Sequence, residues 1–134
     1  MHILVIDDDP SVGAAIQAFL NHQGCEVVVA ENSTLGIRAF ETSRFDVVLV
    51  DIFMPGTDGL ETIKDFRQRR SNVPIIAMSG FRFRDQMGPT ADFLSMAVSL
   101  GATCCLRKPF GSQNLMAAIN GLRDHVPAST AIGS

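Results

Sequence analysis

Five short apolar runs, rich in β-branched residues and almost free of polar alternation, are the feature that most constrains how this chain can fold. Such runs are typical of parallel strands that are covered on both faces. A segment with apolar residues at helical spacing follows each run, so strand and helix patterns alternate. The alternation predicts an α/β fold with a doubly wound, five-stranded parallel sheet. The expected strands are residues 2–6, 25–30, 45–50, 73–78 and 103–106.

The helices between these strands show capping residues at their expected ends. Asp9 and Pro10 fit the N-cap and the first position of the first helix. Ser33 fits the N-cap of the second helix and Asp58 that of the third. The last helix is expected over residues 112–123, followed by a short flexible tail at 125–134. Basic residues near the end of the third helix are expected to be solvated and close to its negative dipole end: Lys64, Arg67, Arg69 and Arg70.

Length and composition exclude several classes of protein. A chain of 134 residues has the size of one domain, which we expect to span residues 1–124. The net charge of −3 gives no basic footprint for nucleic acid, and no apolar stretch approaches the ~20 residues of a membrane span. The chain begins directly on a strand, which predicts neither a signal peptide nor a transit peptide, and hence a cytoplasmic location.

The cysteines do not suggest a metal site or a disulfide framework. Cys25, Cys104 and Cys105 are odd in number and lack metal-ligand spacing. Neighbouring residues of a strand point to opposite faces, so Cys104 and Cys105 are expected to be separated by the sheet. We interpret the cysteines as small buried residues in a reducing compartment, with a redox role for Cys104 and Cys105 as the less favoured alternative.

Charged and hydroxyl side chains stand just beyond the ends of the predicted strands. They are Asp7, Asp8, Asp51, Ser79 and Lys108. In open α/β sheets the ligand crevice lies outside the carboxyl ends of the strands, so these groups should converge. Two carboxylates ~4 Å apart repel by roughly 4 kcal/mol at an effective dielectric near 20, and the acidic cluster therefore favours a cation. Oxygen ligands without His or Cys suit Mg²⁺, and the implied substrate is a phosphoryl group.

With these residues placed, the chain resembles the receiver domain of two-component response regulators over residues 1–124. Four motifs in the expected order carry the resemblance: Asp7-Asp8, the loop from Asp51 to Gly59, Ser79-Gly80 and Lys108-Pro109-Phe110. The resemblance implies a flavodoxin-like (βα)5 fold with strand order 2-1-3-4-5. It also implies that the protein is a regulator rather than a turnover enzyme.

The resemblance implies a role for each residue at the strand ends. Asp51 would be the nucleophile that accepts a phosphoryl group from a phosphohistidine. Lys108 and the Ser79 hydroxyl would bind the phosphoryl oxygens. The Mg²⁺ ligands would be Asp8, Asp51, the backbone carbonyl of Phe53 and, through a water molecule, Asp7.

The implied partners are a histidine kinase or histidine phosphotransfer protein as donor and a downstream protein as target. A phosphorylation-dependent homodimer is one implied output, whereas direct contact with nucleic acid or a membrane is not expected. Cys105 stands where the family usually has an aromatic switch residue. The chain is also longer than the family pattern in the Arg82–Thr90 stretch. Switching is therefore expected to use Ser79 and this stretch in place of an aromatic rotation.

Two other functions remain open. A Mg²⁺-dependent phosphatase of haloacid dehalogenase type also places an aspartate after a parallel strand, but it needs a second aspartate two residues later, where this chain has Phe53. A degenerate receiver that serves only as a binding surface would not need the residues that are all present here: Asp8, Asp51, Ser79 and Lys108.

Two further expectations concern lifetime and output. Phe53 and Phe81 stand two residues beyond Asp51 and Ser79, where bulky apolar side chains would hinder an attacking water, so self-dephosphorylation is expected to be slow. Nothing after Arg123 predicts a second domain, which fits a stand-alone regulator and equally a piece of a longer protein.

Overall fold

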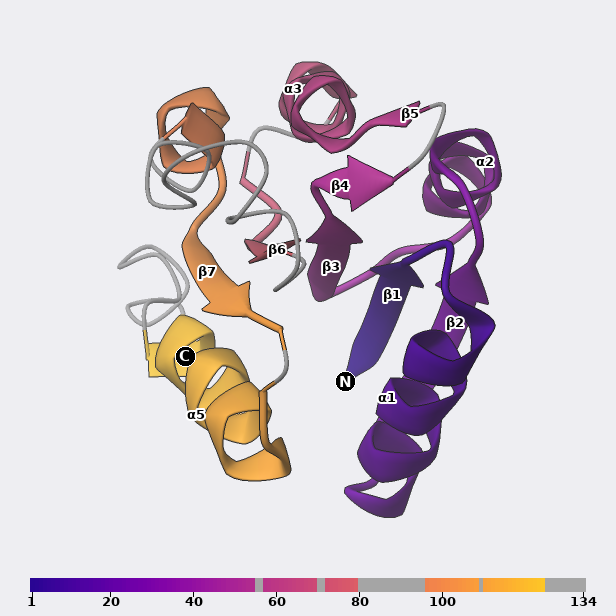
Figure 1. Cartoon of the computed structure of the whole chain (residues 1–134), viewed down its shortest axis with the longest axis vertical. Coiled ribbons are helices and arrows are strands. Elements are labelled where there is room, and N and C mark those ends of the chain that lie inside the picture. Colours follow the sequence, from indigo (N-terminus) through magenta and orange to yellow (C-terminus); the bar gives the residue numbers. More distant parts are fainter. Residues whose placement is uncertain (55–56, 70–71, 80–95, 109, 125–134) are drawn as a thin grey trace.

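The computed structural model describes residues 1–54, 57–69, 72–79, 96–108 and 110–124. Its main sheet consists of β1 (His2–Ile6), β2 (Glu26–Ala30), β3 (Val47–Asp51), β6 (Ile75–Ser79) and β7 (Cys104–Arg107). The strands are parallel and lie in the order β2-β1-β3-β6-β7. Since β6 and β7 are the fourth and fifth strands of this sheet, the predicted doubly wound order 2-1-3-4-5 is confirmed (Figure 1).

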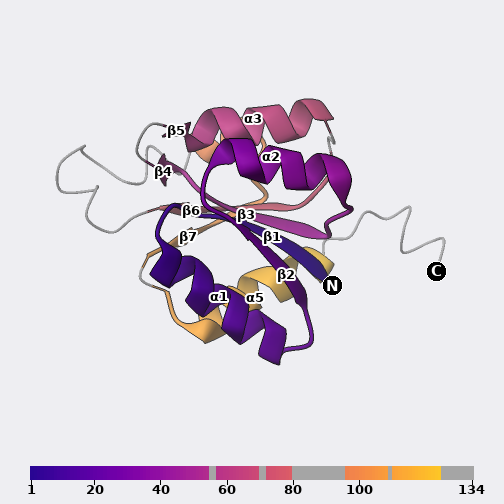
Figure 2. The ribbon, with the colours of Figure 1, turned by 90° about the vertical axis from the view of Figure 1, so that its right-hand side faces the viewer.

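Helices cover both faces of the sheet, as predicted from the apolar residues at helical spacing that follow each strand. They are α1 (Pro10–His22), α2 (Ser33–Thr42), α3 (Gly59–Arg69) and α5 (Ser112–Asp124), with a further helical segment at residues 96–100. Figure 2 shows α2 and α3 on one face and α1 and α5 on the other. Ala97 and Leu100 of the further segment pack into the core on the side of α2 and α3.

The pattern of burial explains why the apolar runs became strands. Along β1, Leu4 and Ile6 belong to the core under α2 and α3, whereas Ile3 and Val5 belong to the core under α1 and α5. Fully burying such a side chain contributes roughly 1.5–3 kcal/mol, so runs that are apolar at every position favour the middle of the sheet. The central strands β1, β3 and β6 are buried almost throughout, but the edge strands β2 and β7 are only partly covered.

Of the predicted caps at α1 and α2, the first is confirmed and the second is wrong. The Asp9 carboxylate accepts hydrogen bonds from the first turn of α1, with Pro10 at its start. At α2 the cap is Asn32, whose Oδ1 accepts from the Leu35 N–H at 2.8 Å. Ser33 is already helical, and its Oγ lies 2.5 Å from the Thr62 Oγ1 of α3, so its hydroxyl joins two helices.

The expectation that Arg67 is solvated is also wrong. Its guanidinium is half-buried and donates to the carbonyl oxygens of Val73 at 2.5 Å and Gly101 at 2.8 Å. Burial lowers the pKa of Arg67. The side chain thus ties the end of α3 to the segments that lead into β6 and β7. Arg69 is exposed as expected, and it pairs with Asp65 and Glu41.

A short antiparallel pair that the sequence does not predict follows β3. It consists of β4 (Phe53–Met54) and β5 (Thr57–Asp58), and Phe53 is paired with Asp58. Asp58 was expected to cap the next helix; it is the last residue of β5, and α3 begins at Gly59.

Several predicted features lie outside the described residues. They are Arg70, Gly80, Phe81, the Arg82–Thr90 stretch, Pro109 and the tail at 125–134. The expectations about slow water attack, switching through Arg82–Thr90 and the flexible tail therefore stay predictions. Within the described ranges, no helix is both long enough and apolar enough to span a membrane.

Candidate functional site

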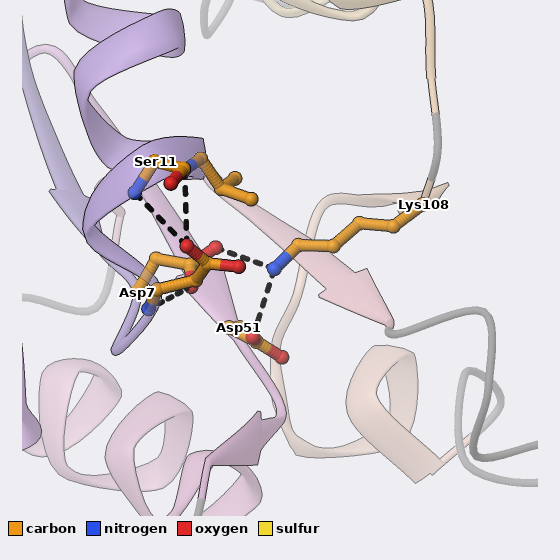
Figure 3. Close-up of polar contacts among 6 residues, drawn as sticks. Asp7, Ser11, Asp51 and Lys108 are labelled. Carbon is orange, nitrogen blue, oxygen red and sulfur yellow. Dashed lines mark hydrogen bonds and ion pairs between the residues drawn. The ribbon is translucent and has the colours of Figure 1, made fainter.

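Residues at four strand ends lie at the carboxyl edge of the sheet. Asp7 follows β1, Asp51 ends β3, Ser79 ends β6 and Lys108 follows β7. Figure 3 shows Lys108 extending from its strand end toward Asp7 and Asp51. A backbone hydrogen bond joins the ends of β6 and β7 at this edge, because the Lys108 N–H donates to the Ser79 carbonyl at 2.8 Å. The convergence that the sequence predicts is therefore present.

Lys108 forms a bridge between two buried carboxylates. Its Nζ lies 2.5 Å from Asp7 Oδ2 and 2.9 Å from Asp51 Oδ2. Asp7 is 1% exposed and Asp51 4% exposed, so water does little to screen these charges. An unpaired charge at such a depth is costly, and the ammonium offsets that cost for both residues.

The pKa of Lys108 follows from a balance of opposing effects. Burial lowers it, but the hydrogen bond to Asp7 and the charge of Asp51 raise it, and the net shift is upward. Lys108 is therefore charged at neutral pH. Because the folded-state pKa is raised, the pairing stabilises the fold below the ordinary lysine pKa, and this stabilisation is lost as the pH rises through the folded-state pKa.

Among the described residues, three carboxylates share the site with the Lys108 ammonium. Oxygen atoms of Asp7, Asp8 and Asp51 all lie within 4.8 Å of one another, and Asp8 is the exposed member. At about that separation each pair of carboxylates repels by roughly 3 kcal/mol at an effective dielectric near 20. Three negative charges against one positive charge leave an excess of two, which favours a divalent cation with a preference for oxygen ligands.

The Ser79 hydroxyl is the second unusual group of the site. Ser79 is 1% exposed, and its Oγ has no hydrogen-bond partner among the described residues. A buried hydroxyl without a partner costs roughly 1–3 kcal/mol. An acceptor such as a phosphoryl oxygen at this edge of the sheet would remove that cost.

Gly59 supports the site through a close approach that sequence reasoning missed. A Cβ atom at Gly59 would lie 2.3 Å from the Ile52 Cα and 2.5 Å from the Asp51 carbonyl oxygen. The first residue of α3 thus packs directly on the backbone that carries Asp51. The sequence shows a glycine at the start of a predicted helix, but it does not show that the backbone of Asp51 and Ile52 lies against this glycine.

Cys104 and Cys105 lie on opposite faces of β7, as predicted. Cys105 packs against the core on the side of α2 and α3, and Cys104 against the core on the side of α1 and α5. Burial raises the pKa of both thiols, and Cys104 raises that of Cys105 further. Both thiols are therefore protonated at neutral pH, which disfavours the redox alternative.

Comparisons with known proteins place this site in a family. Residues 3–120 match the family model of the response regulator receiver domain. The regulatory protein VirG of Agrobacterium fabrum is 36% identical over 118 residues, which cover 88% of this chain and 44% of VirG. The transcriptional regulatory protein DltR of Streptococcus agalactiae is 34% identical over 119 residues, covering 89% of this chain and 50% of DltR. The chain spans about half the length of the curated relatives it matches.

Solved structures agree with the family match. A response regulator receiver domain protein from Clostridium thermocellum has a TM-score of 0.79 and 33% identity, covering 90% of this chain and 91% of that chain. The response regulator TrrA of Thermotoga maritima, solved in complex with Mg²⁺ and BeF, has a TM-score of 0.74 and 26% identity, covering 90% and 97%. These matches favour a receiver over the haloacid dehalogenase alternative. The chain belongs to the response regulator receiver domain family of two-component systems.

Proposed function

We propose that this protein is a phosphoacceptor that takes a phosphoryl group from the phosphohistidine of a histidine kinase or phosphotransfer protein onto Asp51. The supporting observation is the position of Asp51, buried at the carboxyl edge of the sheet, 2.9 Å from Lys108 and beside two further carboxylates. An Asp51 oxygen forms a bond to phosphorus while the phosphorus–nitrogen bond to the histidine breaks. The products are an acyl phosphate on Asp51 and a free imidazole on the donor.

Mg²⁺ fits the residues of this site. The donor set consists of oxygen atoms, and its excess negative charge matches a divalent cation. We assign the ligands as Asp8, Asp51, the Phe53 carbonyl and, through a water molecule, Asp7. When bound, the ion would offset the repulsion between the Asp51 carboxylate and the phosphoryl oxygens. The related TrrA was solved with Mg²⁺ and BeF, which supports Mg²⁺ as the ion.

Lys108 and Ser79 would hold the phosphoryl group once it is on Asp51. Lys108 already lies within hydrogen-bond distance of Asp51, so its ammonium can bind a phosphoryl oxygen with little movement. The Ser79 hydroxyl would donate to another oxygen and gain the partner that it lacks among the described residues. Ser79 is therefore our proposed switch residue, with Cys105 at the position where the family usually has an aromatic ring.

The proposed output is regulation of a downstream protein rather than enzymatic turnover. We propose that the receiver unit spans residues 1–124, acts in the cytoplasm and dimerises on phosphorylation. Its net charge of −3 gives the unit itself no footprint for nucleic acid. VirG and DltR each have about half of their length outside the part that matches this chain. A longer protein that contains this receiver unit would have room for a second domain with its own output.

The proposed function is tested by labelling the protein with acetyl phosphate. Incubation with acetyl phosphate and Mg²⁺, followed by intact-mass analysis, is expected to add one phosphoryl group. The same incubation in excess chelator is expected to add none, because the carboxylates would then repel the incoming phosphate. If the protein is labelled neither with Mg²⁺ nor in excess chelator, the proposed function is wrong, and the alternative of a degenerate receiver that serves only as a binding surface is favoured.

Mg²⁺ alone is expected to stabilise the unphosphorylated protein. A ligand that binds only the folded state at ten times its Kd stabilises that state by ~1.4 kcal/mol, which raises the melting temperature by a few degrees. Circular dichroism suits the measurement, since the chain has no Trp or Tyr. Asp8→Ala is expected to lose the response, whereas Glu26→Ala, which removes an exposed acid from β2, should keep it. An unchanged response in Asp8→Ala would contradict the proposed ligand set.

A further inference from the structure

A continuous chain of hydrogen bonds connects Lys108 to the first turn of α1. Lys108 Nζ donates to Asp7 Oδ2 at 2.5 Å, and the Asp9 N–H donates to the other carboxylate oxygen, Asp7 Oδ1, at 2.9 Å. The Asp9 carboxylate in turn accepts from the N–H groups of Ser11 at 2.9 Å and Val12 at 3.4 Å. The site and the helix start are thus joined through Asp7 and Asp9. Figure 3 shows Asp7 together with Lys108 and with Ser11 of the first turn.

Both oxygens of Asp7 have partners, and their orientation has few alternatives. Asp7 is 1% exposed, so water cannot replace a lost partner at low cost. Its own N–H is held by the Ala30 carbonyl at 3.0 Å, which fixes its backbone to the end of β2. The remaining freedom is rotation of the carboxylate. The Asp9 N–H limits that rotation on one side and the Lys108 ammonium on the other.

The contacts of an N-cap residue hold the backbone of Asp9 on the side of α1. Its carboxylate binds the first turn of α1, and its carbonyl accepts from the Gly13 N–H at 3.0 Å. Pro10 follows at the first helical position, where its fixed φ favours the helix start. These contacts fix the direction of the Asp9 N–H, which is aimed at Asp7.

We infer that Asp9, which the sequence explains as a cap for α1, is also a positioning residue for the phosphorylation site. Its cap holds the turn over residues 7–9, the turn orients the Asp7 carboxylate, and Asp7 holds the Lys108 ammonium beside Asp51. Loss of the Asp9 carboxylate would therefore loosen Lys108 without removing any group that contacts the phosphoryl donor. The inference rests on the proposed function, because it concerns phosphorylation of Asp51.

The test compares two N-caps of the same fold. Asp9→Ala and Asn32→Ala each remove one cap, and each should lower the melting temperature by a similar few degrees. Asp9→Ala is expected to slow labelling by acetyl phosphate and Mg²⁺ by about tenfold, since a misplacement of ~1 Å in a reacting site can cost up to about 10²-fold. Asn32→Ala is expected to keep the wild-type rate.

Three further variants separate positioning from charge and from stability. Asp9→Asn and Asp9→Ser remove the negative charge but keep a capping oxygen, and both are expected to label at nearly the wild-type rate. Asp9→Gly costs the helix little but lacks the carboxylate, so it should be slow, as Asp9→Ala is. As a measurement independent of phosphorylation, the NMR chemical shift of the Lys108 side-chain carbon next to Nζ should move toward that of a solvated lysine only in the slow variants.

Each outcome decides between these explanations. Equal labelling rates for Asp9→Ala and Asn32→Ala would overturn the inference. It would also be overturned if Asp9→Asn and Asp9→Ser were labelled as slowly as Asp9→Ala, because that result would assign the effect to the charge of Asp9. An unchanged Lys108 shift in Asp9→Ala would also overturn it. If the wild-type protein is not labelled at all, the proposed function fails, and the Lys108 shift still decides whether Asp9 positions the ammonium.

Discussion

Asp51→Asn is expected to abolish labelling by acetyl phosphate and Mg²⁺. The amide has nearly the shape of the carboxylate, but it lacks the charged oxygen that attacks phosphorus. The variant should still fold, because Lys108 keeps its hydrogen bond to Asp7. Intact-mass analysis of the variant after the same incubation measures the effect, and a circular dichroism melt checks the fold.

Two comparisons make the Asp51 result specific. Asp65→Asn changes an aspartate of α3 that pairs with Arg69 and is not a member of the acidic cluster, and it should be labelled like the wild type. Peptide mapping of the labelled wild-type protein should place the phosphoryl group on Asp51. Full labelling of Asp51→Asn, or a label that maps to Asp8, would show that the nucleophile is a different carboxylate.

Gly59→Ala is expected to cause the largest loss of stability among single substitutions near the site. The added Cβ would lie 2.3 Å from the Ile52 Cα and 2.5 Å from the Asp51 carbonyl oxygen, and both are backbone atoms that cannot rotate away. The start of α3 or the end of β3 must therefore move. Overpacking typically costs 1–3 kcal/mol, and we expect a value of about 3 kcal/mol or more here because no side chain can yield. Urea unfolding followed by circular dichroism measures it.

The matched control for Gly59→Ala is Gly121→Ala. Gly121 lies within α5, and among the described residues a Cβ there would meet no atom outside the neighbouring backbone of its own helix within 4 Å. Replacing a helix-interior glycine by alanine stabilises a helix by roughly 0.5–1 kcal/mol, so this variant should unfold at higher urea concentration than the wild type. A Gly59→Ala protein with unchanged stability would show that the contact with Ile52 and Asp51 can relax.

The fold was predictable because its determinants are local in the sequence. The run at 45–50 is apolar at every position but Asp46, and β3 (Val47–Asp51) is buried at every position. β1 has its predicted bounds, and the bounds of the other four strands differ from the predicted ones by at most two residues, since strand ends depend on the neighbour that pairs with them. The β4 and β5 pair was not predicted, because two-residue strands carry too little periodicity to be recognised.

Capping residues show where local reasoning reaches its limit. Asp9 was identified correctly because Pro10 marks the first helical position. Asn32 and Ser33 are both good caps, and the sequence could not choose between them. The choice follows from packing, since the Ser33 hydroxyl meets Thr62 of α3 and leaves Asn32 to cap α2.

Local patterns in the sequence predict the five strands, their parallel direction and the acidic edge where Asp7, Asp8 and Asp51 meet, because parallel strands bring their carboxyl ends to one side. The strand order came from the family resemblance, and tertiary packing sets which groups bind one another at this edge. Lys108 lies 101 residues from Asp7 in the chain, and Arg67 finds its carbonyl partners 6 and 34 residues away. Such partners depend on distances of a few tenths of an ångström between packed segments, and no local pattern of residue types encodes those distances.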